Sequence, residues 1–247
     1  MYDAILAEST SITGYRDHVV EAYLSRPMRP GPIGSVVVIH HMPGYDRSTK
    51  EITRRFAEGG FAAICPNLYH REAPGADSDD AAAAARAAGG VPDERLIGDM
   101  FGAVRYLRGL TSSNGRVGII GYCSGGRQAL LAACHLDLQA AVDCYGAFVA
   151  RAPSPEMSSR VRPIVEHLPQ LSCPLLGLFG AEDIYPTPEE VVDLEQALAK
   201  AGKDFDFHTY EGAGHAFFDV DRPGYRPSAA TDGWGRILKF FGLHLSN

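Results

Sequence analysis

A cysteine between glycines is the residue of this chain best suited to chemistry, in Gly121-Tyr122-Cys123-Ser124-Gly125. The apolar run 117–120 precedes it and a helix-like run, 127–134, follows it, so the pattern predicts a strand, a tight turn and a helix. A residue at such a turn has a strained backbone, and glycine on both sides avoids side-chain clashes. The pattern predicts that Cys123 is a nucleophile. The alternative is a buried structural cysteine in a glycine-rich turn.

Nucleotide binding is excluded by the residues that follow this turn. A phosphate-binding loop needs lysine and then serine or threonine after its glycines, but Gly126 is followed by Arg127 and Gln128. No G-x-G-x-x-G fingerprint of dinucleotide binding follows any predicted strand either. We therefore expect a nucleophilic thiol rather than a phosphate site.

A thiol is mostly protonated at neutral pH, so a cysteine nucleophile needs a base, and the base needs a group that fixes its tautomer. Downstream of Cys123, the residues Glu182 and Asp183 come just after the predicted strand 175–179. A carboxylate there would lie at the carboxyl end of a strand, where functional groups of such sheets lie. We predict Asp183 as the acid. Glu182 is its close competitor, and a solvated loop charge is the alternative to both.

The predicted base is His215, in Gly212-Ala213-Gly214-His215. This histidine follows the alternating segment 205–210, which predicts a strand. The small residues before it let a loop fold closely over the cysteine turn. His208 lies inside the segment and is interpreted as structural. The order along the chain is thus nucleophile, acid and base.

The elements that must position these residues alternate between strands and helices. Continuous apolar runs predict strands that are covered on both faces, at 36–39, 62–65, 117–120, 140–145 and 175–179. Helical spacing predicts a helix over 93–110, and Thr187-Pro188-Glu189-Glu190 predicts the capped start of another that runs to about Ala201. The alternation predicts a mostly parallel, doubly wound α/β sheet with helices on both faces.

Three further segments complete the predicted arrangement. Alternating stretches at 5–12 and 18–24, separated by Gly14, predict an antiparallel N-terminal strand pair. The segment 72–92, rich in alanine, glycine and acidic residues, is interpreted as a variable loop, with a short helix beside the site as the alternative. The stretch 235–245 predicts a final helix packed on the sheet.

Composition narrows the partners. A length of 247 residues with 45% hydrophobic content suits one domain, which we expect to span 1–247. A net charge of −7 without a basic tract argues against nucleic acid and anionic membranes as partners. No apolar stretch reaches the roughly eighteen residues of a membrane span, and the N-terminus lacks the pattern of a signal peptide. We expect a soluble, cytoplasmic protein, and the sequence does not predict its oligomeric state.

Five cysteines, an odd number without a C-x-x-C pair, argue against a disulfide framework. The four other than Cys123 lie in or beside apolar segments and are expected in the core, at Cys65, Cys134, Cys144 and Cys173. The nine histidines show no metal-ligand spacing, so we predict no metal site.

Several separated motifs together resemble one known family. They are the strand and turn 36–44, Cys65-Pro66-Asn67-Leu68-Tyr69, the cysteine turn, Tyr145-Gly146, 180–183 and 212–215. Over almost its full length the chain resembles the dienelactone hydrolase family, also called carboxymethylenebutenolidases. The resemblance implies an α/β-hydrolase fold, a triad of Cys123, Asp183 and His215, and hydrolysis of a small-molecule ester or lactone without a cofactor.

Two backbone N–H groups, those of Ser124 and Met42, are predicted to form the oxyanion hole, because Pro43 cannot donate. One departure from the family concerns the thiol. Family members commonly carry a glutamate beside the nucleophile at the position of His41. We hypothesise that His41 pairs instead, as an imidazolium, with a standing thiolate. The alternative is that it hydrogen-bonds a loop backbone.

A second departure concerns the substrate. The best-known family members bind a substrate carboxylate through arginines, one of them four residues after the catalytic histidine, where this chain has Asp219. Either Arg71 or Arg127 replaces that arginine, with Arg71 as the better candidate, or the substrate is not the dienelactone. We favour a different substrate. Tyr145 and Phe217 are predicted to line the pocket, with a place in the core as the alternative.

The predicted reaction is attack of Cys123 on a carbonyl, a thioester acyl-enzyme, and its hydrolysis by water activated at His215. Two other functions fit the same residues. An acyltransferase would transfer the acyl group to a thiol or alcohol, which product analysis with added nucleophiles would reveal. A non-catalytic small-ligand-binding module would show no cysteine-dependent turnover. The intact set of three residues favours the hydrolase.

Overall fold

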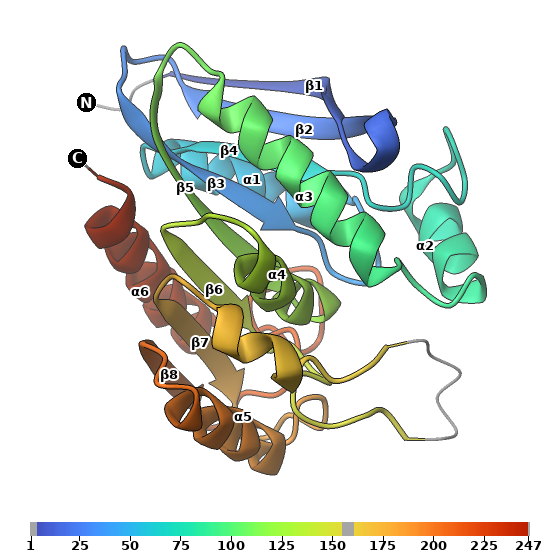
Figure 1. The fold of residues 1–247 in the computed structure, drawn as a ribbon, viewed down its shortest axis with the longest axis vertical. Coiled ribbons are helices and arrows are strands. Elements are labelled where there is room, and N and C mark those ends of the chain that lie inside the picture. Colours follow the sequence, from blue (N-terminus) through green and yellow to red (C-terminus); the bar gives the residue numbers. More distant parts are fainter. Residues whose placement is uncertain (1–3, 155–160, 247) are drawn as a thin grey trace.

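An eight-stranded sheet forms the centre of the molecule (Figure 1). The computed structural model describes residues 4–154 and 161–246. Across the sheet the strands follow the order β1-β2-β4-β3-β5-β6-β7-β8. Their bounds are β1 Ile5–Thr13, β2 Val19–Pro27, β3 Ile33–Ile39, β4 Ala62–Pro66, β5 Ser113–Tyr122, β6 Ala140–Cys144, β7 Leu175–Gly180 and β8 Phe205–Tyr210. Each lies where an alternating or continuous apolar pattern predicts a strand.

Strand direction divides the sheet into two parts. β1 pairs antiparallel with β2, and β2 antiparallel with β4. The remaining neighbours, from β4 and β3 to β7 and β8, are parallel. This confirms the predicted mostly parallel sheet with an antiparallel N-terminal pair. β3, β5, β6 and β7 therefore end at one edge, and the loops after them carry most of the residues predicted to be functional.

Helices cover both faces of the sheet, as the alternation predicts (Figure 1). Phe56 of α1 and Phe241 of α6 lie in one core cluster, whereas Met100 of α3 and Leu130 of α4 lie in another. The strand β3, buried along its whole length, contributes side chains to both clusters, which explains its continuous apolar run. The helix bounds are α1 Arg47–Glu58, α2 Ser78–Ala87, α3 Asp93–Arg108, α4 Ser124–His135, α5 Pro188–Lys200 and α6 Pro227–Leu245, with short 3₁₀ helices at η1 Tyr15–Asp17 and η2 Val165–Gln170.

The ends of the helices test the sequence predictions. Thr187 caps α5 as predicted, because its side chain accepts a hydrogen bond from Glu190 N at 3.3 Å. The predicted helix over 93–110 is α3. The final helix, α6, begins well before the predicted residue 235, since Pro227 occupies its first turn. α2 lies in the segment interpreted as a variable loop, so the alternative of a short helix there is confirmed.

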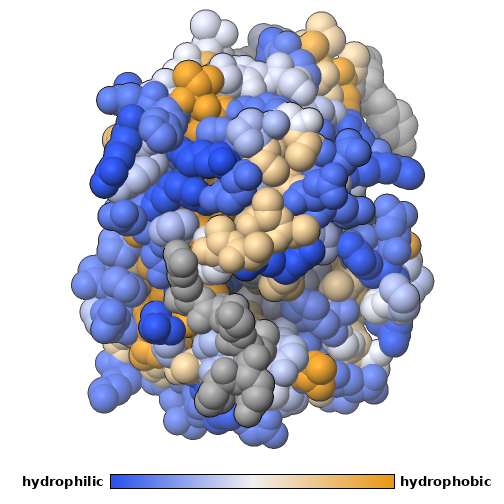
Figure 2. Space-filling view, turned by 90° about the vertical axis from the view of Figure 1, so that its right-hand side faces the viewer, coloured by the Kyte–Doolittle hydropathy of each residue, from blue (hydrophilic) through white to orange (hydrophobic). Residues whose placement is uncertain are grey.

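Figure 2 shows the side of the molecule toward which β3 points in Figure 1. This surface is mostly hydrophilic, with a patch of more hydrophobic residues across its centre. Within the described ranges, no helix combines the length and the hydrophobicity that a membrane span requires.

Candidate active site

Cys123 lies at the tight turn between β5 and α4, as predicted. Its φ of 56° and ψ of −125° form a strained combination for a residue with a side chain. Cys123 N donates to Cys144 O at 3.0 Å, and Gly126 N donates to Cys123 O at 2.9 Å. A Cβ on Gly121 would lie 1.8 Å from Gly125 O, so only glycine fits there. The turn therefore has the geometry expected of a nucleophile elbow.

Asp183 and His215 lie together at the same edge of the sheet. The Asp183 side chain is fully buried just after β7, and its Oδ2 lies 2.9 Å from His215 Nδ1. Asp183 Oδ1 accepts a hydrogen bond from Tyr185 N at 2.8 Å, which fixes the carboxylate. His215 also interacts with Cys123, and this interaction contributes to its raised pKa. The structure thus brings the three predicted residues together, whereas Glu182, the competing acid, is exposed.

Opposing influences set the charge of His215. Burial lowers its pKa, whereas the hydrogen bonds to Asp183 and Cys123 and the charge attraction of both raise it. The net result is a pKa of about 10 against an ordinary 6.5, so His215 is an imidazolium at neutral pH. A cation within hydrogen-bond reach of a thiol favours the thiolate. His215 therefore supplies a positive charge beside the turn that carries Cys123.

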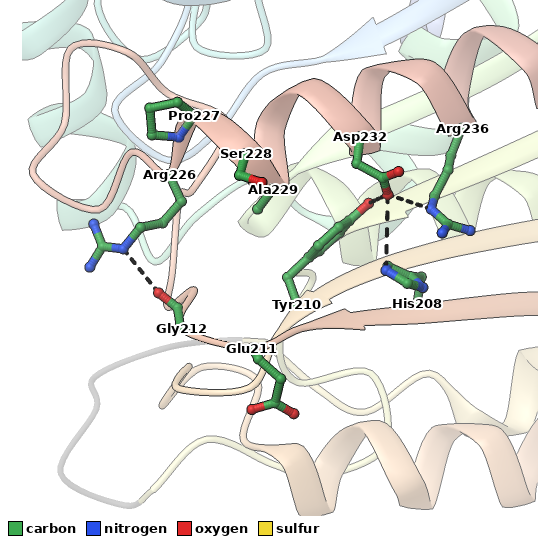
Figure 3. Close-up of a pocket in the computed structure, with 10 residues that line it drawn as sticks. All are labelled: His208, Tyr210, Glu211, Gly212, Arg226, Pro227, Ser228, Ala229, Asp232 and Arg236. Atoms are coloured by element: carbon green, nitrogen blue, oxygen red, sulfur yellow. Dashed lines mark hydrogen bonds and ion pairs between the residues drawn. The ribbon is translucent and has the colours of Figure 1, made fainter.

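The loop that carries His215 is fastened on two sides. Glu182 N donates to Ala213 O at 2.9 Å, which joins this loop to the loop of the acid. Arg226 Nε donates to Gly212 O at 3.0 Å, at the rim of a pocket of about 490 Å³ between β8 and α6 (Figure 3). These bonds restrict the positions that the histidine can take.

Polar groups in the pocket of Figure 3 bind one another rather than the triad. Tyr210 Oη donates to Asp232 Oδ2 at 2.8 Å, and Arg236 Nε donates to the same oxygen at 2.6 Å. His208 Nε2 lies 4.0 Å from it. His208 thus belongs to a cluster around Asp232, in agreement with its interpretation as structural.

The two residues predicted to supply oxyanion N–H groups lie on neighbouring elements. Ser124 is the first residue of α4, where a helix leaves its N–H groups without intrahelical partners. Met42 lies on the loop after β3. The start of this loop packs so closely on α4 that a Cβ on Gly125 would lie 2.6 Å from Ile39 O and 2.8 Å from His40 O. The Met42 loop therefore lies directly against the start of α4.

Two carboxylates contact His41. Its Nε2 lies 2.6 Å from Asp46 Oδ2, and its Nδ1 lies 3.9 Å from Asp219 Oδ2. Burial raises the pKa of Asp46, but the hydrogen bond and the charge attraction of His41 lower it to about 2. Asp46 also caps α1, because its Oδ1 accepts a hydrogen bond from Thr49 N at 2.9 Å. The imidazole therefore has carboxylate partners of its own, and its pairing with the thiolate stays a prediction.

The two arginines considered as substrate ligands already bind carboxylates. Arg71 donates to both oxygens of the fully buried Asp99, at 2.7 and 2.9 Å. Arg127 donates to both oxygens of Asp93, at 2.9 Å in each case. Bidentate pairs of this kind hold the guanidinium in place. A substrate carboxylate would therefore have to share either guanidinium with the carboxylate that already holds it.

The two aromatic candidates for the pocket differ in their relation to the triad. The Tyr145 ring packs edge-on against His215, with ring centroids 5.1 Å apart, although only 2% of the residue is exposed. Phe217 is fully buried and lies 5.2 Å from the rings of both Tyr145 and Tyr210. The structure thus supports the alternative that Phe217 belongs to the core, and it places Tyr145 against the histidine.

Sequence patterns did not single out two residues that hold the site. Tyr69 Oη donates to Met42 O at 3.0 Å, and Asp46 holds His41 as described above. Tyr69 lies in a motif that carries the family resemblance, and this is the one signal that could have drawn attention to it. Asp46 carries the ordinary signal of a helix cap, which says nothing of a second partner.

The remaining cysteines lie away from solvent. Cys65, Cys134, Cys144 and Cys173 are buried, which confirms their predicted place in the core, whereas Cys123 is partly exposed. Among the described residues, no group of three or more His, Cys, Asp and Glu side chains could hold a metal ion.

Comparisons with known proteins agree with this geometry. The profile of the "Dienelactone hydrolase family" matches residues 20–245. A carboxymethylenebutenolidase homologue of Escherichia coli (strain K12) is 35% identical over 246 residues, which cover 97% of this chain and 88% of the relative. The carboxymethylenebutenolidase of Pseudomonas putida is 30% identical over 243 residues, which cover 96% of each chain.

A solved structure extends the agreement to the fold. The crystal structure of a dienelactone hydrolase homologue from Klebsiella pneumoniae matches with a TM-score of 0.85 at 30% identity. The match covers 97% of this chain and 99% of the other. The expected α/β-hydrolase fold is thereby confirmed. With its sequence, its sheet order and its fold in agreement, the chain belongs to the dienelactone hydrolase family and is a hydrolase of that family.

Proposed function

We propose that this protein hydrolyses a small lactone or activated ester through a thioester on Cys123. The observation that carries the proposal is the position of His215, which hydrogen-bonds Asp183 and interacts with Cys123 at a strained elbow. Asp183 holds the proton on Nδ1, which leaves Nε2 to exchange a proton with the sulfur and the substrate.

The reaction begins with attack of the Cys123 sulfur on the carbonyl carbon. The N–H groups of Ser124 and Met42 hold the oxygen of the tetrahedral intermediate, where negative charge develops. Collapse expels the alcohol or enol, which takes its proton from His215 and leaves a thioester. His215, now neutral, takes a proton from water as the water attacks the thioester, and the acid is released with the thiolate restored.

The charges near the site bear on the substrate. Asp219, four residues after His215, is buried and accepts a hydrogen bond from Ser48 Oγ at 3.1 Å. Arg71 is held by Asp99. A substrate carboxylate would meet repulsion from Asp219 and would have to compete with Asp99 for Arg71. We therefore favour an uncharged lactone or ester over the dienelactone, whose carboxylate requires a cationic partner.

A cytoplasmic location accords with this chemistry. All five cysteines are free, and a thiol nucleophile with four further unpaired cysteines suits a reducing compartment.

The test is hydrolysis of a short-chain aryl ester by wild type and Cys123→Ala, with Cys173→Ala as the matched control. We expect turnover that is lost in Cys123→Ala and retained in Cys173→Ala, whose thiol is buried away from the triad. Iodoacetamide should alkylate Cys123 rapidly well below pH 8, since His215 favours the thiolate. Turnover that survives in Cys123→Ala would disprove the cysteine mechanism. Added thiols and alcohols in the same assay separate hydrolysis from acyl transfer.

A further inference from the structure

His40 lies at the start of the loop that carries Met42, and only 1% of its surface is exposed to solvent. Its Nε2 lies 3.2 Å from Leu68 N, and its Nδ1 lies 2.8 Å from His41 O. A backbone N–H can only donate, so Nε2 must be the acceptor and the ring proton must be on Nδ1. Nδ1–H therefore donates to the carbonyl of His41.

Burial keeps this histidine neutral. The loss of water around the ring lowers the pKa of His40 to about 4, in spite of its hydrogen bond to the backbone of His41. Protonation would also place a hydrogen on Nε2, opposite the N–H of Leu68. The hydrogen bond from Leu68 N to the ring would then be lost. At neutral pH the direction of both bonds is thus fixed.

The carbonyl that His40 holds belongs to the peptide before Met42. His41 O also accepts a hydrogen bond from Gly44 N at 3.0 Å, so two donors fix its direction. This peptide is not among the cis bonds of the described chain. In a planar trans peptide the C=O and the following N–H point in opposite directions. Fixing His41 O therefore fixes the direction of the Met42 N–H.

The peptide after Met42 is held as well. Tyr69 Oη donates to Met42 O at 3.0 Å, and the Tyr69 ring packs edge-on against His40 with centroids 4.7 Å apart. On the other side of the loop, His40 O lies so close to α4 that a Cβ on Gly125 would approach it to 2.8 Å. The loop is thus fixed relative to the helix that begins with Ser124, the residue that supplies the second proposed donor.

We propose that His40 is a positioning residue, whose Nδ1–H holds the His41 carbonyl and thereby aims the Met42 N–H at the substrate oxygen. The inference rests on the proposed function, because an oxyanion donor serves an acyl-transfer reaction. His40 touches neither the sulfur nor the substrate. It acts by keeping the donor in place before negative charge develops, so that no rearrangement is needed during the reaction.

Two substitutions separate this role from a general packing role. Asparagine at this position presents an amide N–H where histidine has Nδ1, so His40→Asn keeps the bond to His41 O and loses the acceptor for Leu68 N. Glutamine presents its amide oxygen where histidine has Nε2, so His40→Gln keeps the acceptor and loses the bond to His41 O. Each variant thus removes one of two hydrogen bonds from the same buried ring.

Steady-state hydrolysis of an aryl ester by the full-length protein is the first measurement. We expect His40→Gln to lower kcat about tenfold or more with KM unchanged, somewhat less than the loss of a whole oxyanion donor. His40→Asn should retain kcat within about threefold, although both variants should unfold at similar denaturant concentrations. Equal kcat values for two equally stable variants would overturn the proposal.

The tautomer provides a second measurement that needs no turnover. In ¹⁵N-labelled protein at pH 7, His40 should be neutral with its proton on Nδ1. A proton on Nε2 would overturn the proposal whatever the kinetics show. If wild type hydrolyses the ester and the two variants have the same kcat, His40 is not a positioning residue, whereas the proposed role of Cys123 is unaffected. A wild type without Cys123-dependent turnover would overturn the proposed function and, with it, this inference.

Discussion

The loops that hold His215 and His40 place two largely buried histidines beside one reaction centre, yet their charges differ. Burial lowers the pKa of both rings. His215 has a carboxylate and a thiol as partners, and its pKa rises to about 10. His40 has two backbone groups as partners, and its pKa falls to about 4. Burial disfavours the charge on both rings, and only the ring that has a carboxylate and a thiol as partners has interactions strong enough to outweigh it.

The largest effect should come from removing the partner that charges His215. Asp183→Asn keeps the shape of the acid but loses its charge, and we expect kcat to fall about 10³- to 10⁴-fold, because the tautomer and the imidazolium are no longer supported. Aryl ester kinetics measure this loss. Glu182→Gln is the matched control on the same loop, since Glu182 is exposed, and should keep wild-type kcat. Comparable losses in the two variants would contradict the assignment of Asp183.

Asp183→Asn should also change how the stability of the folded protein depends on pH. The pKa of His215 is raised from 6.5 to about 10, so its charged form stabilises the fold fully below about pH 6.5, and this contribution is lost as the pH rises through about 10. The advantage of wild type over Asp183→Asn should shrink across that window. Urea unfolding of both proteins at pH 6 and above pH 10 tests this. An advantage that does not change with pH would mean that His215 is not charged in the folded protein.

A smaller effect is expected on the backbone side of the comparison. Tyr69→Phe removes the hydroxyl that donates to Met42 O but keeps the ring against His40. We expect kcat to fall a few-fold with KM unchanged, and stability to fall by about 1 kcal/mol, as for one hydrogen bond. Kinetics together with urea unfolding separate the two losses. A loss of stability without any loss of kcat would mean that Tyr69 does not position the Met42 loop for catalysis.

The smallest effect should come from His41, whose imidazole has two carboxylates as partners. His41 is held by Asp46, so in His41→Gln we expect the pH dependence of Cys123 alkylation to match wild type and kcat to stay within about threefold. A profile displaced to higher pH would support the hypothesis that His41 activates the thiol.

The strands and the tight turn at Cys123 could be predicted because each rests on a local signal. Continuous apolar runs mark strands covered on both faces, and glycines mark the elbow. α1 could not be predicted in this way, because polar residues take part of its buried side. Thr49 and Thr53 are buried there, and Thr53 Oγ1 donates a hydrogen bond to Thr49 O at 2.9 Å. Few residues along this helix are strongly apolar, so its buried side is marked mainly by the absence of charged residues.

The partners of charged residues could not be predicted, because they come from distant parts of the chain. Arg71 pairs with Asp99, and His41 lies near Asp219, only because the fold brings these distant residues together. An arginine after a strand has the same appearance in the sequence whether it binds a substrate or a buried aspartate. The prediction of Asp183 rather than Glu182 as the neighbour of His215 agrees with the structure. Only the fold, however, shows which of the two side chains points inward.

The missing space around Gly121 and Gly125 has a consequence for anyone who wishes to redesign this protein. A methyl group added at Gly121 would collide with the backbone of the elbow itself, at Gly125, and one added at Gly125 would collide with the backbone of Ile39 and His40. Neither segment can be enlarged or reshaped to suit a new substrate without displacing the other. Libraries for altered selectivity should therefore leave both segments untouched.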